Sequence, residues 1–216
     1  MSTINVDNIA EYTSSGKINA THDIKLASGK NILDSNGDAI GGMVKLASET
    51  VSSATASVIF DDFVDNSKYS LYKIFTHHIL PVTDNNNFWA VFRSGGASGS
   101  DITGTYRRAG TARYPDTSGS TVFGNQSSAN YAPIVPGNGA NADESLIIDM
   151  TYRVCDGTNG INSIQSDTAY QLADDTVRNQ VVIHILEQTI AATGIKFQMN
   201  TGNIASGTIT IYGVLL

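Results

Sequence analysis

The chain has 216 residues, of which 15% are charged, and carries a formal net charge of −7 at pH 7. This acidity argues against a protein that binds nucleic-acid phosphates, because such proteins present a basic surface. A single cysteine rules out an intrachain disulfide, and the apolar runs are too short to span a membrane. The polar start of the chain differs from a secretory signal, so we expect synthesis and folding in a reducing cytoplasm.

Residues 1–42 are predicted to form a separate N-terminal segment, because apolar side chains are sparse there. Short β-like pieces at 4–9, 23–26 and 31–34 are separated by glycine-containing turns, one of them an Asn-Gly pair. Nine aliphatic side chains cannot offset the entropy lost on ordering the whole segment. It is therefore expected either to be disordered or to be ordered by other chains, as in an intertwined homo-oligomeric stalk.

Residues 43–216 have the pattern of a dense β domain, in which apolar and polar residues alternate or β-branched and aromatic residues cluster. The predicted strands are 43–47, 57–61, 71–82, 88–93, 146–154, 177–186, 195–199 and 208–214. At least eight strands without a convincing helix predict an all-β fold. We expect a jelly-roll-like antiparallel β-sandwich head at 43–216, preceded by a short extended β-rich stalk.

The stretch between Phe92 and Leu146 lacks a clear strand pattern and is predicted to form long loops, which in compact domains are usually functional or disordered. Its tyrosine, serine, glycine and asparagine residues suit adaptable binding loops, and arginine can pair with the carboxylates of acidic glycans. The alternative is that these loops contact neighbouring subunits or extend into solvent. The predicted receptor-binding residues are Tyr106, Arg107, Arg108, Arg113, Tyr114 and Tyr131.

No histidine or cysteine pattern indicates catalysis, a cofactor or a metal site. His77 and His78 are adjacent on a predicted strand and should point to opposite faces, so they are not expected to bind one ion. His184 lies among aliphatic residues and is expected to be buried or at an interface, and Cys155 is expected to be a core or half-buried thiol.

The acidic clusters are also weak candidates. Asp61, Asp62 and Asp65, and likewise Asp174 and Asp175, have the carboxylate spacing of a calcium loop but not the ligand order of an EF-hand. The same residues could supply a glycosidase pair, whose geometry a sequence does not reveal. We interpret them as solvated turn acids. The glycine-rich stretch 94–100 lacks the Gly-Lys-Ser/Thr ending of a phosphate-binding loop.

Both ends of the chain resemble tail-fibre-like virion proteins of bacteriophages, especially marine and cyanobacterial ones. Residues 1–9 and 24–37 are similar to the N-terminal portion of such proteins, and 193–213 to the C-terminal strand pair of their β-sandwich domains. Residues 69–72 and 79–84 are similar to their early core strands. The resemblance implies a homotrimeric, non-enzymatic virion component that attaches to the particle through its N-terminal segment.

We therefore expect a phage tail fibre or adhesin on the virion surface that contributes to host attachment, with three weak sites gaining avidity within one trimer. The alternative is a purely structural virion part, such as a capsid fibre, decoration or tail adaptor protein. A polysaccharide depolymerase is a third, less favoured hypothesis. The expected partners are further copies of the chain, other virion proteins through residues 1–42, and a host surface glycan or protein. No cofactor, metal, nucleic acid or membrane insertion is expected.

Overall fold

A computed structural model describes residues 42–113, 120–158 and 160–215. The chain divides into two compact units, Met1–Ile40 and Gly41–Leu216, and the account that follows concerns the second. The predictions for the N-terminal segment 1–42, apart from its last residue, lie outside the described residues.

The second unit is built from strands, and its described residues contain two short 3-10 helices but no α-helix. None of these residues belongs to a helix long and apolar enough to cross a membrane. The elements are β1 (Met43–Val51), β2 (Ser57–Phe60), β3 (Tyr69–Pro81), β4 (Asn86–Ser94), η1 (Gly96–Ser98), β5 (Ser100–Asp101), β6 (Thr105–Arg113), β7 (Ser120–Ala129), β8 (Ala132–Asn138), η2 (Ala142–Glu144), β9 (Leu146–Arg153), β10 (Asn162–Gln171), β11 (Val177–Leu186), β12 (Gly194–Met199) and β13 (Ile204–Leu215).

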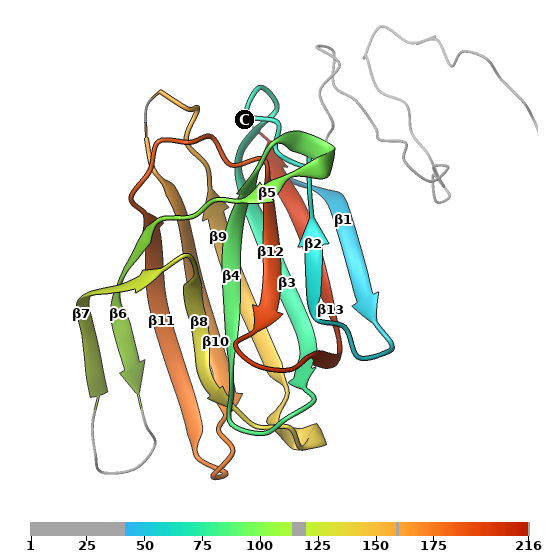
Figure 1. The fold of residues 1–216 in the computed structure, drawn as a ribbon. Helices are drawn as coiled ribbons and strands as arrows, with labels where there is room; N and C mark the ends of the chain where they lie inside the picture. Colours follow the sequence, from blue (N-terminus) through green and yellow to red (C-terminus); the bar gives the residue numbers. More distant parts are fainter. Residues whose placement is uncertain (1–41, 114–119, 159, 216) are drawn as a thin grey trace, which may run out of the picture. The chain divides into compact units, whose positions relative to one another are not determined.

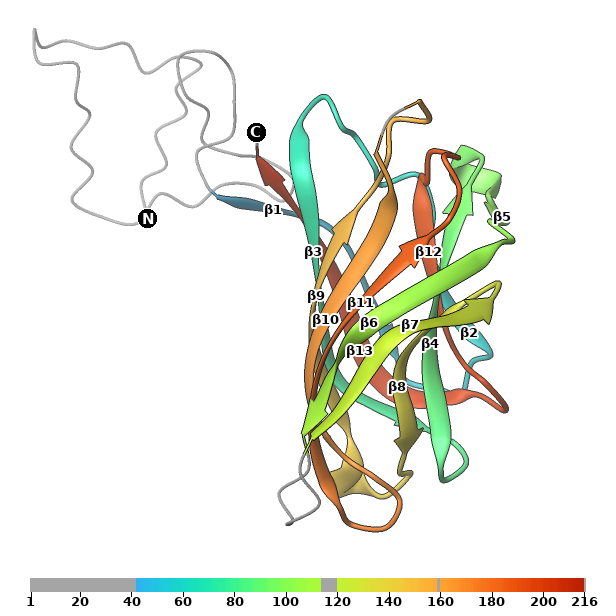
Figure 2. The same ribbon diagram turned by 90° about the vertical axis from the view of Figure 1, so that its left-hand side faces the viewer.

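The strands form two antiparallel sheets packed face to face, which confirms the predicted all-β sandwich (Figure 1). One sheet has eight strands in the order β1-β13-β3-β9-β10-β11-β6-β7. The other has the order β2-β12-β4-β5, with β8 pairing to β4 beside this path. The turned view shows the two layers and the β6–β7 hairpin at the margin of the larger sheet (Figure 2).

The alternating apolar pattern directs one face of each strand into the space between the sheets. In β9, Leu146, Ile148, Met150 and Tyr152 are buried, whereas Ile147 and the other outward residues are half-buried or exposed. All eight predicted strands are present, with most of their ends shifted by one to four residues. A clear alternation of side chains was therefore sufficient to locate them.

Aromatic rings fill the centre of the sandwich. Phe92 stacks on Tyr106 and on Tyr152, with ring centroids 5.6 and 5.2 Å apart, and Phe88 stacks on Phe197 at 5.6 Å. All five side chains are at most 1% exposed. Such pairs add to the free energy gained from burying their area. The stacks of Phe92 join β4 of the smaller sheet to β6 and β9 of the larger one, whereas Phe88 and Phe197 pack within the smaller sheet.

The space between β8 and the larger sheet is more polar. The side-chain amide of Gln180 donates to the Ile134 carbonyl of β8 at 2.8 Å, and Gln180 is 1% exposed. Thr168 and His184 are buried on the same inner face, on β10 and β11. A buried backbone carbonyl needs a donor, and on Ile134 a side chain supplies it in place of a neighbouring strand.

A partly buried ion cluster lies on the smaller sheet. Arg93 Nε donates to Asp61 at 2.7 Å, and the same guanidinium bonds Asp101, which also pairs with Lys196. The Arg93 side chain is 11% exposed and also donates to the carbonyl of Gly99. These bonds attach the 94–101 turn to strands β2, β4 and β12.

The prediction of long loops between Phe92 and Leu146 was wrong for most of that stretch, which contains β5, β6, β7 and β8. Two inward positions of β6 are occupied by Arg108 and Gly110 in place of large apolar residues. The missing apolar alternation removed the signal by which a half-buried strand is recognised. The Ser-Gly-rich start of the stretch is a turn with η1, in which Gly95 and Gly96 have φ values of 102° and 70°.

Candidate functional site

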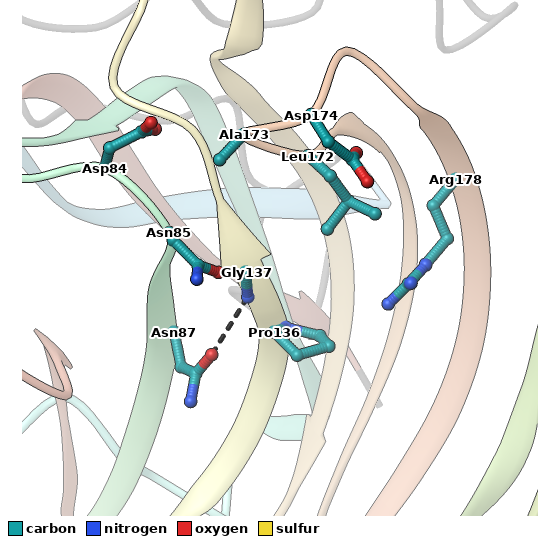
Figure 3. A pocket seen from close by; sticks show the side chains of 9 residues that line it. All are labelled: Asp84, Asn85, Asn87, Pro136, Gly137, Leu172, Ala173, Asp174 and Arg178. Atoms are coloured by element: carbon teal, nitrogen blue, oxygen red, sulfur yellow. Dashed lines mark hydrogen bonds between the residues drawn. The ribbon is translucent and has the colours of Figure 1, made fainter.

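A pocket of about 620 Å³ opens at one end of the sandwich, where the β3–β4 connection, the end of β8 and the β10–β11 hairpin meet (Figure 3). Its volume lies within the range of small-molecule sites, about 300–1,000 Å³. The lining residues are Asp84, Asn85, Asn87, Pro136, Gly137, Leu172, Ala173, Asp174 and Arg178.

The local backbone explains why these turns leave an opening. Asn85 has a φ of 54° and Gly137 a φ of 69°, in the left-handed region that asparagine and glycine tolerate best. A Cβ atom at Gly137 would lie 3.0 Å from the Leu172 side chain and 3.2 Å from Oδ1 of Asn85. Glycine at this position therefore keeps the pocket open as well as permitting the turn.

Hydrogen bonds fix the wall formed by β3–β4 and β8. Oδ1 of Asn87 accepts the backbone N–H of Gly137 at 2.9 Å, and Oδ1 of Asp84 accepts that of Ala140 at 3.0 Å. Behind them Asn86, 1% exposed, donates to the Thr201 carbonyl at 2.6 Å. The polar groups of this wall are thus held in place before a ligand arrives, which reduces the entropy cost of binding.

The opposite wall comes from the β10–β11 hairpin. Oδ1 of Asp174 accepts the backbone N–H of Thr176 at 3.1 Å. Hydrogen bonding by the Thr176 side chain, then by this backbone N–H, lowers the pKa of Asp174, and the charge of Arg178 adds a smaller effect. Nη1 of Arg178 donates to the Tyr170 hydroxyl at 3.3 Å, and its guanidinium carbon lies 5.9 Å from the centre of the Tyr170 ring. Asp174 is therefore an acceptor at neutral pH, and Arg178 is oriented by the tyrosine beside it.

The pocket combines hydrogen-bonding groups with a small apolar surface. Figure 3 shows Asp84 on one side and Arg178 on the other, with Leu172 and Pro136 between them. The carboxylates accept hydrogen bonds, the guanidinium donates them, and the asparagine amides can do both. Such a site can bind a small ligand that has several hydroxyl groups and one apolar face.

None of the five predicted receptor-binding residues that the structure describes lines this pocket. Tyr106 is fully buried, and its hydroxyl accepts the backbone N–H of Phe92 at 3.0 Å, so its assignment to an exposed binding loop was wrong. Its ring faces inward because β6 places alternate residues on opposite faces, and burial raises the pKa of its phenol. Tyr114 lies outside the described residues.

The other four are spread over different surfaces. Arg107 is exposed and pairs with Glu187 on the outer face, whereas Arg108 points inward, is half-buried and has its pKa lowered by that burial. Arg113 is exposed at the end of β6. Tyr131 stacks on Trp89, with ring centroids 3.8 Å apart. These residues were predicted to act together because most of them are close in the sequence. In the structure β6 directs its alternate residues to opposite faces of the sheet and so separates them.

The described histidines and the cysteine differ in burial. His184 and Cys155 are buried, as predicted, at 0% and 2% exposure. The expectation that His77 and His78 face opposite sides was wrong: both are exposed, and their rings lie 4.1 Å apart. The cause is a bulge in β3, at which His78 has a φ of 52°.

The acidic clusters divide between structure and pocket. Asp61 pairs with Arg93, and Asp65 caps a turn by accepting the backbone N–H of Ser67 at 3.1 Å. Asp174 lines the pocket. In the described part of the chain, no three histidine, cysteine, aspartate or glutamate side chains come together to hold a metal ion.

Sequence reasoning missed most of the pocket. The run from Asp84 to Asn87 could have been recognised as a polar turn, and Asp174 was already a candidate, but nothing local connects the two.

The chain matches no protein-family model, no curated protein and no solved structure.

Proposed function

We propose that the chain is a non-enzymatic phage virion fibre protein, a homotrimeric tail fibre or adhesin whose β-sandwich head contributes to attachment to the host surface. The observation that supports attachment is the pocket at the end of the head, with its fixed polar groups and small apolar surface. The resemblance of both chain ends to tail-fibre-like proteins supports the virion location. Three such pockets in one trimer would bind a dense surface with useful avidity even if each is weak.

Binding fits the pocket better than hydrolysis. A glycosidase needs one carboxylic acid with a raised pKa, which protonates the leaving group. The pKa of Asp174 is lowered, because Thr176 donates to it and Arg178 lies nearby. Asp174 is thus suited to accept hydrogen bonds from a ligand, and its partner across the pocket, Asp84, already accepts one from the backbone of Ala140.

The experiment blocks the pocket without removing a polar group. Ala173→Trp places a large side chain on the pocket wall, and Ala109→Trp makes the same change at an exposed outward position of β6. Full-length proteins, checked for folding by circular dichroism, are applied to an array of bacterial surface polysaccharides. We expect wild type and Ala109→Trp to bind the same spots and Ala173→Trp to lose at least 90% of the signal. Equal binding by both variants would remove the pocket from the attachment function.

The oligomeric state is tested separately by light scattering on the full chain. A homotrimer has three times the monomer mass of 22.9 kDa. A mass equal to that of the monomer at micromolar concentration would contradict the trimer and the avidity argument.

The second candidate is a purely structural virion component, in which the head would contact neighbouring subunits. Val122 on β7 and Ile147 on β9, which are 70% and 53% exposed, are apolar side chains that such contacts would cover. Cryo-electron microscopy of the virion distinguishes the two: a head projecting from a tail favours the fibre, and a head packed against the capsid shell favours a decoration or capsid-fibre role.

A further inference from the structure

We infer that the pocket binds an uncharged sugar residue and discriminates against the corresponding sugar acid. This inference rests on the proposed attachment function and specifies its ligand. It also reverses the sequence-based expectation that arginine would select acidic glycans, because the pocket is lined by one arginine and two aspartates.

The charge of the lining residues is the first argument. Asp84 and Asp174 carry negative charges, Arg178 carries the one positive charge among the nine lining residues, and the sum is −1. The whole chain is also negative, at −7. A carboxylate entering the pocket would therefore meet like charge, which disfavours a partner more strongly than an equivalent neutral contact favours it.

The engagement of Arg178 is the second argument. Its guanidinium donates to the Tyr170 hydroxyl and lies against that ring, and its charge already acts on Asp174. A guanidinium that already donates to a tyrosine and acts on an aspartate offers less attraction to a second carboxylate. It still has N–H groups of the kind that donate to the hydroxyl oxygens of a sugar.

The remaining groups match a sugar ring. A hydroxyl both donates and accepts, so it can bond to a carboxylate oxygen of Asp174 and to the amide of Asn85 or Asn87 without an unpaired charge. Leu172 and Pro136 offer an apolar surface to the C–H face of a pyranose. A volume of about 620 Å³ accommodates one or two such rings.

The test uses matched sugars that differ only in oxidation at C6. Methyl glucoside, galactoside and mannoside are compared with their uronates by saturation-transfer NMR and titration calorimetry on the full-length protein. We expect at least one hexoside to bind about tenfold more tightly than its uronate at low salt. The ratio should shrink as salt is raised, because screening weakens the repulsion.

Substitution of one carboxylate tests the cause of the preference. Asp174→Asn keeps the size and an acceptor for the Thr176 N–H but removes the charge, so the preference should fall to about threefold or less. Asp175→Asn is the matched control: it removes a charge from the neighbouring turn residue, which does not line the pocket, and should leave the ratio near tenfold.

The outcomes separate this inference from the proposed function. If a uronate binds as tightly as its hexoside or more tightly, the inference is wrong, while attachment through the pocket stands. If the array shows that Ala173→Trp still binds, the pocket is not the attachment site and both fail. If neither sugar class binds a protein whose folding is verified, the assignment of an uncharged sugar is overturned.

Discussion

His184 makes the stability of the head depend on pH in a way that one substitution removes. Its ring is 0% exposed on the inner face of β11, opposite Arg108 on β6 and Ile164 on β10. Within the described residues neither ring nitrogen makes a well-formed hydrogen bond, although the Pro133 carbonyl acts on the ring. Burial, reinforced by the positive charge of Arg108 and opposed by the Pro133 carbonyl, lowers the pKa of His184 from 6.5 to about 3.

The sign follows from which state takes up the proton. Below pH 6.5 the unfolded chain binds a proton at His184, whereas the folded chain binds it only below about pH 3. Lowering the pH from 6.5 to 3 therefore favours the unfolded state. Each pH unit within the window removes about 1.4 kcal/mol, which gives a loss of about 3 kcal/mol between pH 7 and pH 4. This is a large part of the roughly 5–15 kcal/mol that stabilises a typical domain.

The assay is urea unfolding of the full chain at pH 7 and pH 4, followed by the fluorescence of Trp89, the single tryptophan. His184→Gln removes the titrating ring, and the free energy of unfolding of this variant should fall by about 3 kcal/mol less than that of wild type. His77→Gln, which removes an exposed histidine, serves as the control and should behave as wild type. An equal loss in wild type and His184→Gln would refute the argument that the buried ring stays neutral.

Three further changes test the packing. Arg93→Met leaves Asp61 without its partner and Asp101 with Lys196 alone, and should cost about 2–4 kcal/mol in urea unfolding. Lys68→Met, at an exposed pair, should leave the free energy of unfolding nearly unchanged. Gly110→Ala would place a Cβ 2.2 Å from the Val181 carbonyl oxygen and should lower the free energy of unfolding by about 2 kcal/mol or more. Gly42→Ala, which has open space around it, should leave the free energy of unfolding unchanged. Equal effects of the two substitutions on the free energy of unfolding would contradict the close approach at Gly110. Tyr106→Phe leaves the buried Phe92 N–H without its acceptor, so it should cost about 1–3 kcal/mol of folding stability and leave binding to the polysaccharide array unchanged. A loss of binding without a loss of stability would instead support Tyr106 as a contact residue.

Most of the strands that could be predicted have an apolar inner face. The exception is β11, whose inner face is partly polar and which its β-branched residues indicated. In β13, Ile209 and Ile211 are buried and alternate with half-buried polar or aromatic residues, and this pattern was sufficient. In β10 the buried positions include Ser166 and Thr168, and no strand was predicted there. Burial alternates over 164–170 in β10 and over 208–214 in β13, but only in β13 does it coincide with an alternation of hydrophobicity.

The pocket could not be predicted because no single segment contains it. Its residues come from the β3–β4 turn, the end of β8 and the β10–β11 hairpin, which lie at one end of the sandwich only after both sheets have formed. Asp84 and Asp174 are 90 positions apart in the sequence. The predicted binding residues failed for the opposite reason, since neighbours such as Arg107 and Arg108 are sent to opposite faces of one strand.

Side chains of β11 contribute both to the polar interior of the sandwich and to the pocket. Arg178, Gln180 and His184 alternate onto its inner face, and the first lines the pocket while the second donates to the Ile134 carbonyl of β8. Two residues further along β8 begins the Pro136–Gly137 wall of the same pocket. Polar side chains on β11 thus hold the strand that forms one wall and supply the arginine of the other. A purely apolar β11 would leave the Ile134 carbonyl without its donor and the pocket without its cation, so Gln180 and Arg178 both serve the pocket end of the sandwich.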